Sequence, residues 1–424
     1  MRIGHISFRL AGTDGVSLET AKIVDVLRTM GHSNYYFAGE LDPPIESEQS
    51  SNKEIIGSMC VPQAHFNHPK VLWITDHAFG NSTPHPDLFQ TIEDLAQLLE
   101  KELFKFIQQY KIEFLTVQNV FALPMNLSLS IAIYRVLKVT GIPAIAHNHD
   151  FYWEREKYLN NCVGQILEEV FPPQLPNLKH MVINSQAQSE LKKRGFQSTI
   201  MPNIFDFDAP LPEIDDFNLN LKSELGLNAN DLFFLQPTRV IPRKGIELAI
   251  ELVHQLSDLP IKLIISHNAE LNTLDYLSDL FALAALKKVD LRYLPARFLP
   301  YRVQGVGIQK KFSLWDAYIF TDFVTYPSLY EGFGNAILET IYFHKPFLVN
   351  RYKIYRDDIE PIGIKAVQID GEITEQAVEE VRELLTNPSK VDEITSHNFN
   401  VARNNFSYQT AQTRLEKLFK SFNS

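Results

Sequence analysis

The chain has 424 residues, too many for one ordinary hydrophobic core, so its length predicts two domains. Its composition, 45% hydrophobic and 21% charged, is typical of a globular protein with enough apolar residues for such cores. The formal net charge of −11 argues against nucleic acid or an anionic membrane surface as a partner, because both are polyanions.

Three further features indicate a cytoplasmic protein. The N-terminal MRIGHISF begins directly with an alternating apolar strand and lacks the long apolar segment of a secretory signal. The best candidate for a membrane span, FALPMNLSLSIAIYRVL, is interrupted by Pro124, Asn126 and Arg135. Two cysteines, Cys60 and Cys162, are too few for a disulfide framework or a zinc site. The sequence does not indicate an oligomeric state.

In chain order, strand patterns alternate with helical patterns, which is typical of parallel sheets covered by helices. We expect a strand at RIGHISF, a loop at RLAGTDGV, a helix at SLETAKIVDVLRTMG and strands at SNYYFAGEL, FLTVQNV, IPAIAHNH and HMVINS. Pro, Asp and Asn interrupt the alternation at 201–220 and predict a linker. A second alternation follows, with strands expected at DLFFLQPTRV, IKLIISHN, VDLRYLP, DFVTYPS and KPFLVNRY, and the tail predicts a closing helix.

These patterns predict an α/β protein with two doubly wound, Rossmann-like domains that face each other across a cleft. Ligands of such domains bind at the carboxyl ends of the strands. We place an N-terminal, acceptor-binding domain at residues 1–205 and a C-terminal, nucleotide-sugar-binding domain at 206–395. The closing helix, 396–424, is expected to pack back on the N-terminal domain.

Two cations and a helix start gather in LFFLQPTRVIPRKGIELAIELVHQL. Arg239 lies near the end of the predicted strand, Lys244 lies in the loop, and Gly245 opens the helix. Cations beside a helix N-terminus are suited to hold a diphosphate. Taken alone, a pair of solvated surface cations is the simpler interpretation.

The stretch YPSLYEGFGNAILET places two glutamates with seven residues between them. Glu331 follows a strand, and Glu339 lies one to two turns into a helix expected to begin near Gly334 or Asn335. Carboxylates accept hydrogen bonds from sugar hydroxyls, and the glycines let backbone N–H groups approach closely. The pattern therefore fits one carboxylate at a hexose and one at a ribose. Alternatively, Glu339 balances the helix dipole and the glycines are ordinary turn residues.

The segment GIPAIAHNHDFYWEREKY ends a strand with four polar residues, His147, Asn148, His149 and Asp150. A histidine at the carboxyl end of a strand is able to donate to a sugar hydroxyl or to developing charge. A metal site is the second functional interpretation, but Asp150 points away from the face that His147 and His149 share. The third is that polar residues only terminate the strand.

The loop AGTDGV carries Gly12 and Gly15 but does not match the dinucleotide fingerprint, so an ordinary tight turn stays open. Arg9 precedes it, and Arg155 and Lys157 follow the histidine segment. These three cations are candidates to bind an anionic acceptor, and solvated positions explain them equally well.

The tripeptide DFD, residues 206–208, matches the Asp-x-Asp pattern of metal-dependent sugar transferases. It lies in the expected linker beside Asp215 and Asp216, where acidic residues are mostly solvated. We therefore assign no metal site and expect a mechanism that requires no metal.

Taken together, the motif Glu331-Gly332-Phe333-Gly334 and Glu339 resemble the Glu-seven-residues-Glu signature of family-4 retaining glycosyltransferases. TRVIPRKGIE resembles that family's arginine and lysine segment, IMPNIFDF its crossing between domains, and NSQAQSELKKRGF and IPAIAHNHDF further segments of it. The resemblance covers nearly the whole chain. It implies a GT-B fold, with a nucleotide sugar held mainly by the C-terminal domain and an acceptor bound mainly by the N-terminal one.

The resemblance also implies roles for matching residues: the diphosphate at Arg239 and Lys244, the hexose at Glu331 and His149, the ribose at Glu339. The expected catalytic residues are His149, Glu331, Arg239 and Lys244. The expected donor-binding residues are Gly15, Arg239, Lys244, Glu331, Phe333, Gly334, Asn335 and Glu339. The loop AGTDGV lies near donor phosphate and acceptor in the family, so the expected acceptor-binding residues are Arg9, Gly12, Asp14, Arg155 and Lys157.

We therefore expect a retaining, NDP-sugar-dependent hexosyltransferase without a tightly bound cofactor. The primary expectation is glucose transfer from UDP-glucose to fructose 6-phosphate, giving sucrose 6-phosphate as in the sucrose-phosphate synthases. The chain departs from that group at Gly332, where proline is typical, and at 12–15, where Gly-Gly-Gln is typical.

Two alternatives stay open. A glucosyl- or mannosyltransferase acting on glucosylglycerate, or a related compatible solute, would use the same cations for a carboxylate. The second alternative lies outside the glycosyltransferases: a sugar-nucleotide-binding protein without turnover, or a phosphorylase or hydrolase of similar fold.

Overall fold

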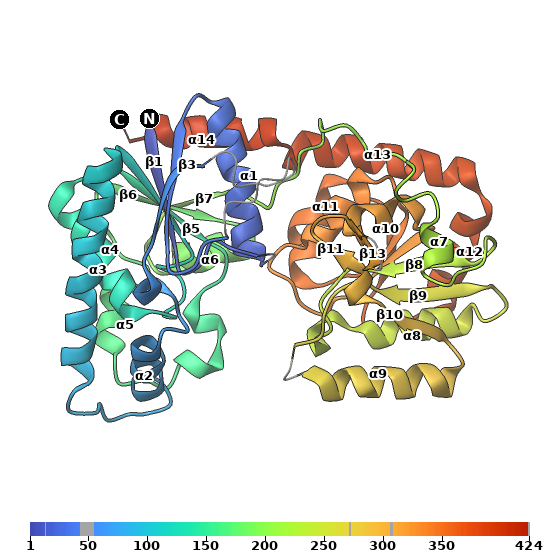
Figure 1. Ribbon diagram of the computed structural model, residues 1–424, viewed down its shortest axis with the longest axis horizontal. Coiled ribbons are helices and arrows are strands. Elements are labelled where there is room, and N and C mark those ends of the chain that lie inside the picture. The colour runs from blue at the N-terminus through green and yellow to red at the C-terminus, as the bar shows by residue number, and fades with distance from the viewer. Residues whose placement is uncertain (13, 43–54, 271–272, 306–307, 423–424) are drawn as a thin grey trace. The chain divides into compact units, whose positions relative to one another are not determined.

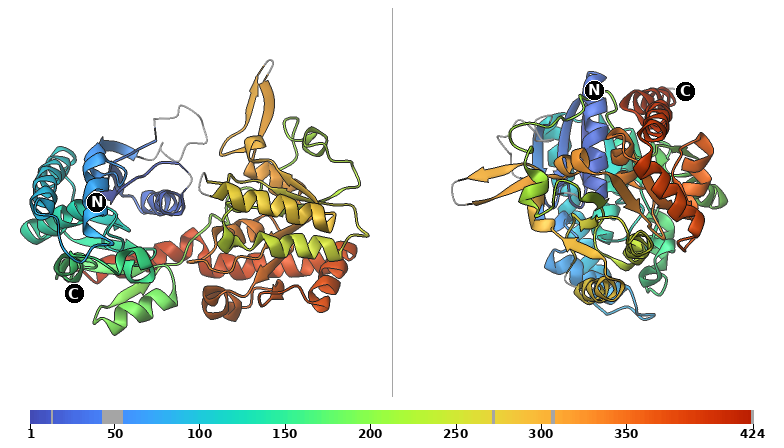
Figure 2. Two further views of the ribbon diagram at one scale, coloured as in Figure 1. Left: turned by 90° about the horizontal axis from the view of Figure 1, so that it is seen from below. Right: turned by 90° about the vertical axis from the view of Figure 1, so that its right-hand side faces the viewer.

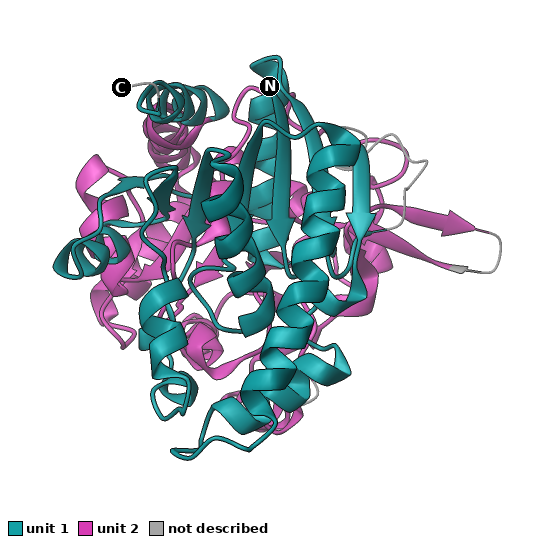
Figure 3. Ribbon diagram, turned by 90° about the vertical axis from the view of Figure 1, so that its left-hand side faces the viewer, with its two compact units in different colours: residues 1–204, 408–424 teal, residues 205–407 magenta. Residues whose placement is uncertain are grey.

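The computed structural model describes residues 1–12, 14–42, 55–270, 273–305 and 308–422. Within these ranges the chain divides into two compact units, shown in teal and magenta in Figure 3. Unit 1 comprises Met1–Ile204 and Tyr408–Ser424, and unit 2 comprises Phe205–Ser407. Each unit is built on a parallel sheet with helices on both faces (Figure 1), which confirms the predicted α/β class with two doubly wound domains.

The sheet of unit 1 has the strand order β3-β2-β1-β4-β5-β6-β7 among the described residues, and every pair is parallel. The order reverses between β1 and β4, which is the point where doubly wound sheets bind ligands. The strands are β1 (Arg2–Ser7), β2 (Ser33–Ala38), β3 (Ile55–Cys60), β4 (Phe114–Gln118), β5 (Ala144–Asn148), β6 (Leu178–Val182) and β7 (Ser198–Ile200).

Apolar side chains at alternate strand positions point to opposite faces of this sheet, and different helices cover the two faces. Leu115, Val117 and Ala146 pack with the helices of one face, whereas Phe114 and Ile145 pack with α1 and α14 on the other. The helices are α1 (Gly15–Thr29), α2 (Pro69–Ala78), α3 (Leu88–Tyr110), α4 (Leu127–Thr140), α5 (Gly164–Val170), α6 (Ser185–Lys193) and α14 (Tyr408–Lys420). The polar side chains of Asp14, His68, Asn126 and Asn184 cap the N-termini of α1, α2, α4 and α6.

The main sheet of unit 2 repeats this topology within the part of the chain that the structure describes. Its order is β10-β9-β8-β14-β15-β16, all parallel, and it reverses between β8 and β14. The strands are β8 (Leu232–Gln236), β9 (Ile261–Ile265), β10 (Asp290–Tyr293), β14 (Phe323–Tyr326), β15 (Phe347–Asn350) and β16 (Val367–Ile369).

A smaller sheet of β11 (Phe298–Leu299), β13 (Ile308–Ser313) and β12 (Val303–Gly305) precedes β14. Its β12–β13 hairpin projects from the body of unit 2, in orange in Figure 2. Buried residues of the main sheet pack with α8, α9 and α12 on one face. The helices of unit 2 are α7 (Leu221–Glu224), α8 (Ile246–Gln255), α9 (Leu274–Lys287), α10 (Leu314–Phe320), α11 (Asn335–Tyr342), α12 (Glu375–Thr386) and α13 (Pro388–Phe406).

The C-terminal tail, expected as one closing helix over 396–424, consists of two helices. Ser407 adopts an extended backbone, with φ −76° and ψ 164°, and separates α13 in unit 2 from α14 in unit 1. Ala411 and Leu415 of α14 pack with Ile23 and Leu27 of α1, which buries α14 against unit 1. Over the described ranges, no helix has both the length and the apolarity that crossing a membrane requires.

Candidate active site

The loops that follow β8 and β14 meet in unit 2, because these two strands pair where the strand order reverses. The Leu329 N–H donates to the Arg243 carbonyl at 2.8 Å and joins the loops. Gly245, the N-cap of α8, has a φ of 59°, and a Cβ atom there would lie 2.5 Å from the carbonyl oxygen of Pro327. A residue without a side chain is therefore required at this contact.

Glu331 lies at the centre of a buried charge cluster formed by these loops. It is 6% exposed and accepts hydrogen bonds from Arg243 Nη1, at 2.7 Å, and from Lys244 Nζ. Burial and the negative charge of Glu331 raise the pKa of the nearby Tyr326 hydroxyl. The structure thus brings Glu331 and Lys244, predicted as separate contacts to a hexose and a diphosphate, into direct contact. Arg243, which the sequence analysis did not select, completes the cluster.

The cluster shifts the pKa of both members of the ion pair. Burial by itself raises the pKa of Glu331, but the positive charges of Lys244 and Arg243 outweigh burial and hold the pKa below its ordinary value. Burial lowers the pKa of Lys244, and the positive charges of Arg243 and Arg239 act in the same direction against the attraction of Glu331. Glu331 pairs with two cations, so the cluster has a net positive charge that attracts an anionic ligand.

Gly334 lies beside the cluster with a φ of 122°. A Cβ atom there would lie 2.7 Å from the Tyr352 hydroxyl and 3.1 Å from the Tyr326 hydroxyl, so glycine is required for both reasons. The Tyr352 hydroxyl donates to the carbonyl of Phe333. The Phe333 ring is buried against Phe406, with ring centroids 5.2 Å apart. These contacts fix the backbone between Glu331 and α11.

Helix α11 begins at Asn335, where the sequence analysis expected its start, and Glu339 lies in the second turn. The Tyr318 hydroxyl donates to Glu339 Oε2 at 3.1 Å. Burial and the negative charge of Glu339 raise the pKa of this hydroxyl. Glu339 is therefore held by a side chain of a neighbouring helix, α10.

Arg239 lies at an exposed position and pairs with Glu270 at 2.8 Å, the two side chains being 54% and 49% exposed. A backbone bridge joins their loops, which follow β8 and β9. In the second of these loops, the pKa of His267 is lowered to about 4 by burial and by the positive charges of Lys244 and Arg239. A neutral imidazole thus lies near the two cations predicted to hold a diphosphate.

In unit 1, His149 follows β5 beside a second histidine. Its ring centroid lies 4.4 Å from that of His147, and Nε2 of each ring is buried without a hydrogen-bond partner among the described residues. Burial lowers the pKa of His149, against the negative charges of Glu19, Asp150 and Asp14. Both imidazoles are therefore neutral at neutral pH.

Asn119, at the end of β4, positions the backbone of His149. It has a φ of 61°, its Oδ1 accepts from the His149 N–H at 3.0 Å, and its Nδ2 donates to Asp150 at 2.9 Å. Asp150 also pairs with Arg155. The Asp150 carboxylate is thus bound by both Asn119 and Arg155.

The residues predicted for acceptor binding lie around the first turn of α1 and after β5. Asp14 caps α1 and pairs with Arg9 at 3.2 Å, and Gly15 is the first helical residue. Arg9 Nε is buried without a partner within the described ranges. The Gly12 N–H donates to Asp42, and Thr13 lies outside the described residues.

The two later cations differ from Arg9. Arg155 is engaged by Asp150, and Lys157 Nζ lies over the Tyr158 ring, 4.6 Å from its centroid. Burial and the charge of Arg155 lower the pKa of Lys157. Arg9 is thus the predicted acceptor cation with a buried donor left to bind a ligand.

The rejected Asp-x-Asp tripeptide lies at the start of unit 2. Asp208 pairs with Arg403, and its own N–H donates to Asp206 at 3.2 Å. No group of three or more His, Cys, Asp or Glu residues in the described part of the chain is arranged to hold a metal ion.

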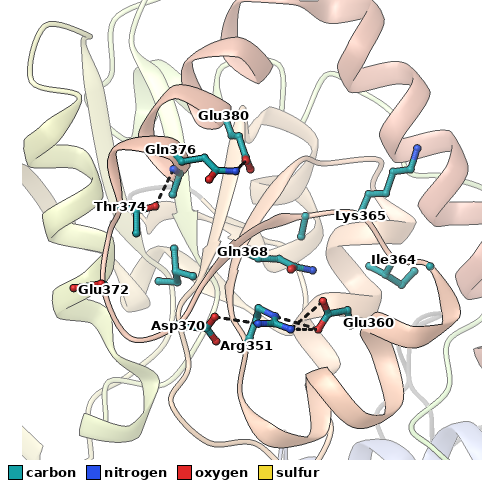
Figure 4. A pocket seen from close by; sticks show the side chains of 14 residues that line it. Arg351, Glu360, Ile364, Lys365, Gln368, Asp370, Glu372, Thr374, Gln376 and Glu380 are labelled. Carbon is teal, nitrogen blue, oxygen red and sulfur yellow. Dashed lines mark hydrogen bonds and ion pairs between the residues drawn. The ribbon is translucent and has the colours of Figure 1, made fainter.

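A polar pocket of about 810 Å³ lies elsewhere in unit 2, along β16 and α12 (Figure 4). Arg351 bonds to Glu360 and Asp370, and Gln376 donates to Glu380 at 2.8 Å. None of the residues predicted for the active site lines this pocket. We therefore do not assign the site to it.

Known proteins resemble this chain in sequence and in fold. Residues 218–400 match the family described as "Glycosyl transferases group 1". The chain is 32% identical to mannosylglucosylglycerate synthase of Petrotoga mobilis, over 96% of this chain and 98% of that protein. It is 31% identical to the Thermotoga maritima protein of the same name, over 98% and 99% of the two chains. Sucrose-phosphate synthase of Thermosynechococcus elongatus has a TM-score of 0.67 at 13% identity, covering 99% of this chain and 98% of that one, which shows the fold alone.

The two doubly wound units give the chain a GT-B fold. The chain belongs to the group 1 glycosyltransferases and is an NDP-sugar-dependent hexosyltransferase. The predicted glycosyltransferase family is confirmed at this level.

Proposed function

We propose that the enzyme transfers a mannosyl group from a nucleotide sugar to glucosylglycerate, with retention of configuration. The observation that carries this proposal is the identity of 32% and 31%, over nearly the full length, to two mannosylglucosylglycerate synthases. Fructose 6-phosphate, the primary expectation from the sequence, has only a fold-level likeness at 13% identity in its favour. The alternative raised from the sequence therefore replaces it.

In the proposed reaction, the bond between the anomeric carbon of the hexose and the diphosphate oxygen breaks. A hydroxyl oxygen of the acceptor bonds to the same face of that carbon, and the hydroxyl proton passes to the departing phosphate. Negative charge grows on the diphosphate, so preorganised cations lower the barrier. Lys244, Arg243 and Arg239 supply them beside the N-terminus of α8.

Carboxylates hold all three cations before the donor binds. Glu331 holds Lys244 and Arg243, and Glu270 holds Arg239. When Lys244 turns toward the diphosphate, Arg243 still compensates the buried Glu331. Glu331 then retains its charge and accepts hydrogen bonds from hexose hydroxyls.

Glucosylglycerate carries one carboxylate. In the proposed complex, Arg9 binds this carboxylate. Arg9 Nε is a buried donor without a partner among the described residues, and a planar guanidinium matches a carboxylate. Arg155 and Lys157 remain secondary candidates. Asp150 contacts Arg155 and the Tyr158 ring contacts Lys157, as Asp14 and the Phe66 ring contact Arg9, so the buried Nε is what favours Arg9.

The test measures nucleoside diphosphate released from UDP-, ADP- and GDP-mannose and the matching glucose donors. Each donor is given with glucosylglycerate, with fructose 6-phosphate or without acceptor. We expect release with a mannose donor only when glucosylglycerate is present, and an α-linked product by NMR. Release that depends on fructose 6-phosphate would restore the sucrose-phosphate hypothesis, and binding without release would favour a non-catalytic protein.

A further inference from the structure

A continuous chain of buried polar side chains crosses the sheet of unit 1 from β2 to β5. Asn34 Oδ1 lies 2.9 Å from His5 Nε2, and His5 Nδ1 lies 2.7 Å from Thr116 Oγ1. Gln118 Nε2 lies 3.2 Å from the same hydroxyl, and Gln118 Oε1 lies 3.1 Å from His147 Nδ1. Each residue is at most 5% exposed. This series of hydrogen-bonded side chains ends at His147, near the carboxyl end of β5.

The first residue of this chain fixes the direction of its hydrogen bonds. Asn34 Nδ2 faces the backbone carbonyls of Val24, at 3.5 Å, and His32, at 3.4 Å, so the amide oxygen is the atom that faces His5. Burial lowers the pKa of His5 to about 4, and its imidazole is neutral at neutral pH. His5 therefore donates through Nε2 and accepts through Nδ1.

The direction then passes along the remaining residues. The Thr116 hydroxyl donates to His5, and its oxygen accepts from the Gln118 amide. The Gln118 oxygen consequently accepts from Nδ1–H of His147. Nε2 of His147 carries no hydrogen and acts only as an acceptor. This atom is buried and has no hydrogen-bond partner in the part of the chain that the structure describes.

A buried acceptor without a partner is costly unless a bound molecule donates to it. Phosphate and carboxylate groups cannot donate at neutral pH, so neither the diphosphate nor the glycerate carboxylate fits this nitrogen. Sugar hydroxyls do fit. His147 lies near the carboxyl end of β5, at the edge of the sheet where doubly wound folds bind ligands, and its ring lies 4.4 Å from that of His149.

We propose that His147 Nε2 accepts a hydrogen bond from a hydroxyl group of a substrate sugar, and that the chain from Asn34 holds the imidazole in the tautomer this bond requires. The inference rests on the proposed function and adds a second substrate-binding imidazole to it. The hydroxyl belongs either to the donor hexose or to the acceptor, and the experiment separates the two.

The test pairs His147→Phe with substrates that lack single hydroxyl groups. We expect one monodeoxy substrate to lower kcat/KM of the wild type by about tenfold to a hundredfold, yet to leave the variant unaffected. A monodeoxy-hexose nucleotide with this effect identifies the donor, and a monodeoxy glucosylglycerate identifies the acceptor. If every monodeoxy substrate lowers kcat/KM of His147→Phe as much as it lowers that of the wild type, the proposed hydrogen bond does not exist.

A second measurement does not depend on turnover or on the folding of His147→Phe. Nitrogen-15 NMR of the wild type should show His147 with its hydrogen on Nδ1, and a hydrogen on Nε2 would overturn the proposal. Thr116→Val removes the hydroxyl that orients Gln118, without contacting His147, and should give a mixture of tautomers. Thr116→Ser keeps the hydroxyl and should retain the wild-type tautomer. If the wild-type enzyme used neither glucosylglycerate nor fructose 6-phosphate, the proposed function would be contradicted. The NMR measurement would still test the tautomer of His147, because it requires no turnover.

Discussion

Glu331 and Lys244 form a buried ion pair that joins the loop after β14 to the loop after β8. The side chains are 8% and 10% exposed, and Arg243 provides the second cation on the same carboxylate. Removing Glu331 leaves the buried charge of Lys244 uncompensated, whereas removing Lys244 leaves Arg243 beside Glu331. Loss of the carboxylate alone should therefore cost more than loss of both partners.

Glu331→Gln should therefore destabilise the protein more than the double variant Lys244→Met/Glu331→Gln. We expect the single change to lower the free energy of unfolding by about 3 kcal/mol and the double change to recover part of this loss. Urea denaturation measures both. The exposed pair of Lys353 and Asp357 offers a control, since Asp357→Asn should cost at most about 0.5 kcal/mol. Both Glu331 variants should lack nucleoside diphosphate release, and equal stability of the two would contradict the ion-pair argument.

Arg243 offers a test of how Lys244 becomes available to the donor. Its Nη1 bonds to Glu331 at 2.7 Å and to the Tyr330 carbonyl at 2.8 Å. In Arg243→Ala, Lys244 alone compensates Glu331, so binding of a diphosphate competes with that pair. We expect the Kd for the nucleoside diphosphate to rise about tenfold by calorimetry. Arg243→Lys keeps the charge and should recover part of the affinity; unchanged binding by Arg243→Ala would refute this role.

Part of this site was predictable from the sequence because parallel strands end at one edge of a sheet. Arg239, Lys244 and Glu331 each follow a strand pattern, and the motif around Glu331 carries a family signature. Pairing of β8 with β14 brings these segments together. Strand patterns alone do not give strand order, so the direct contact of Glu331 with Lys244 required the structure.

Other contacts leave no local signature in the sequence. Arg243 and Glu331 are 88 residues apart, and Arg239 meets Glu270 only because their loops follow adjacent strands. The position of Asn119 against His149 and the tautomer of His147 depend on hydrogen bonds between residues of four strands. Periodicity reports burial, whereas these features depend on partners that are distant along the chain.

Gly245 tests whether the close contact between the two loops is required. Gly245→Ala would place Cβ 2.5 Å from the Pro327 carbonyl oxygen at a φ of 59°. Gly371, also in unit 2, has a φ of 86° and no atom within 4 Å of its added Cβ, so Gly371→Ala reports the backbone strain alone. We expect Gly371→Ala to cost about 1 kcal/mol in urea denaturation, and Gly245→Ala to cost clearly more and to weaken donor binding. Equal costs would show that the loops separate without penalty.

Buried histidines predict how stability depends on pH. Burial lowers the pKa of His180 to about 4, although Nε2 donates to the Pro173 carbonyl at 3.1 Å. An unfolded histidine has a pKa of about 6.5, so below that pH the unfolded chain binds a proton that the folded protein excludes. The free energy of unfolding therefore falls as pH falls from 6.5 toward 4. Between pH 7 and pH 5, His180 should account for a loss of about 2 kcal/mol.

His180→Gln keeps a donor for the Pro173 carbonyl and removes the titrating group. We expect its free energy of unfolding to fall less than that of the wild type between pH 7 and pH 5, by about 2 kcal/mol in urea denaturation. His85→Gln, at a side chain that is 42% exposed, is the matched control and should follow the wild type. If His180→Gln loses as much stability as the wild type, His180 is protonated in the folded protein and its burial does not exclude the charge.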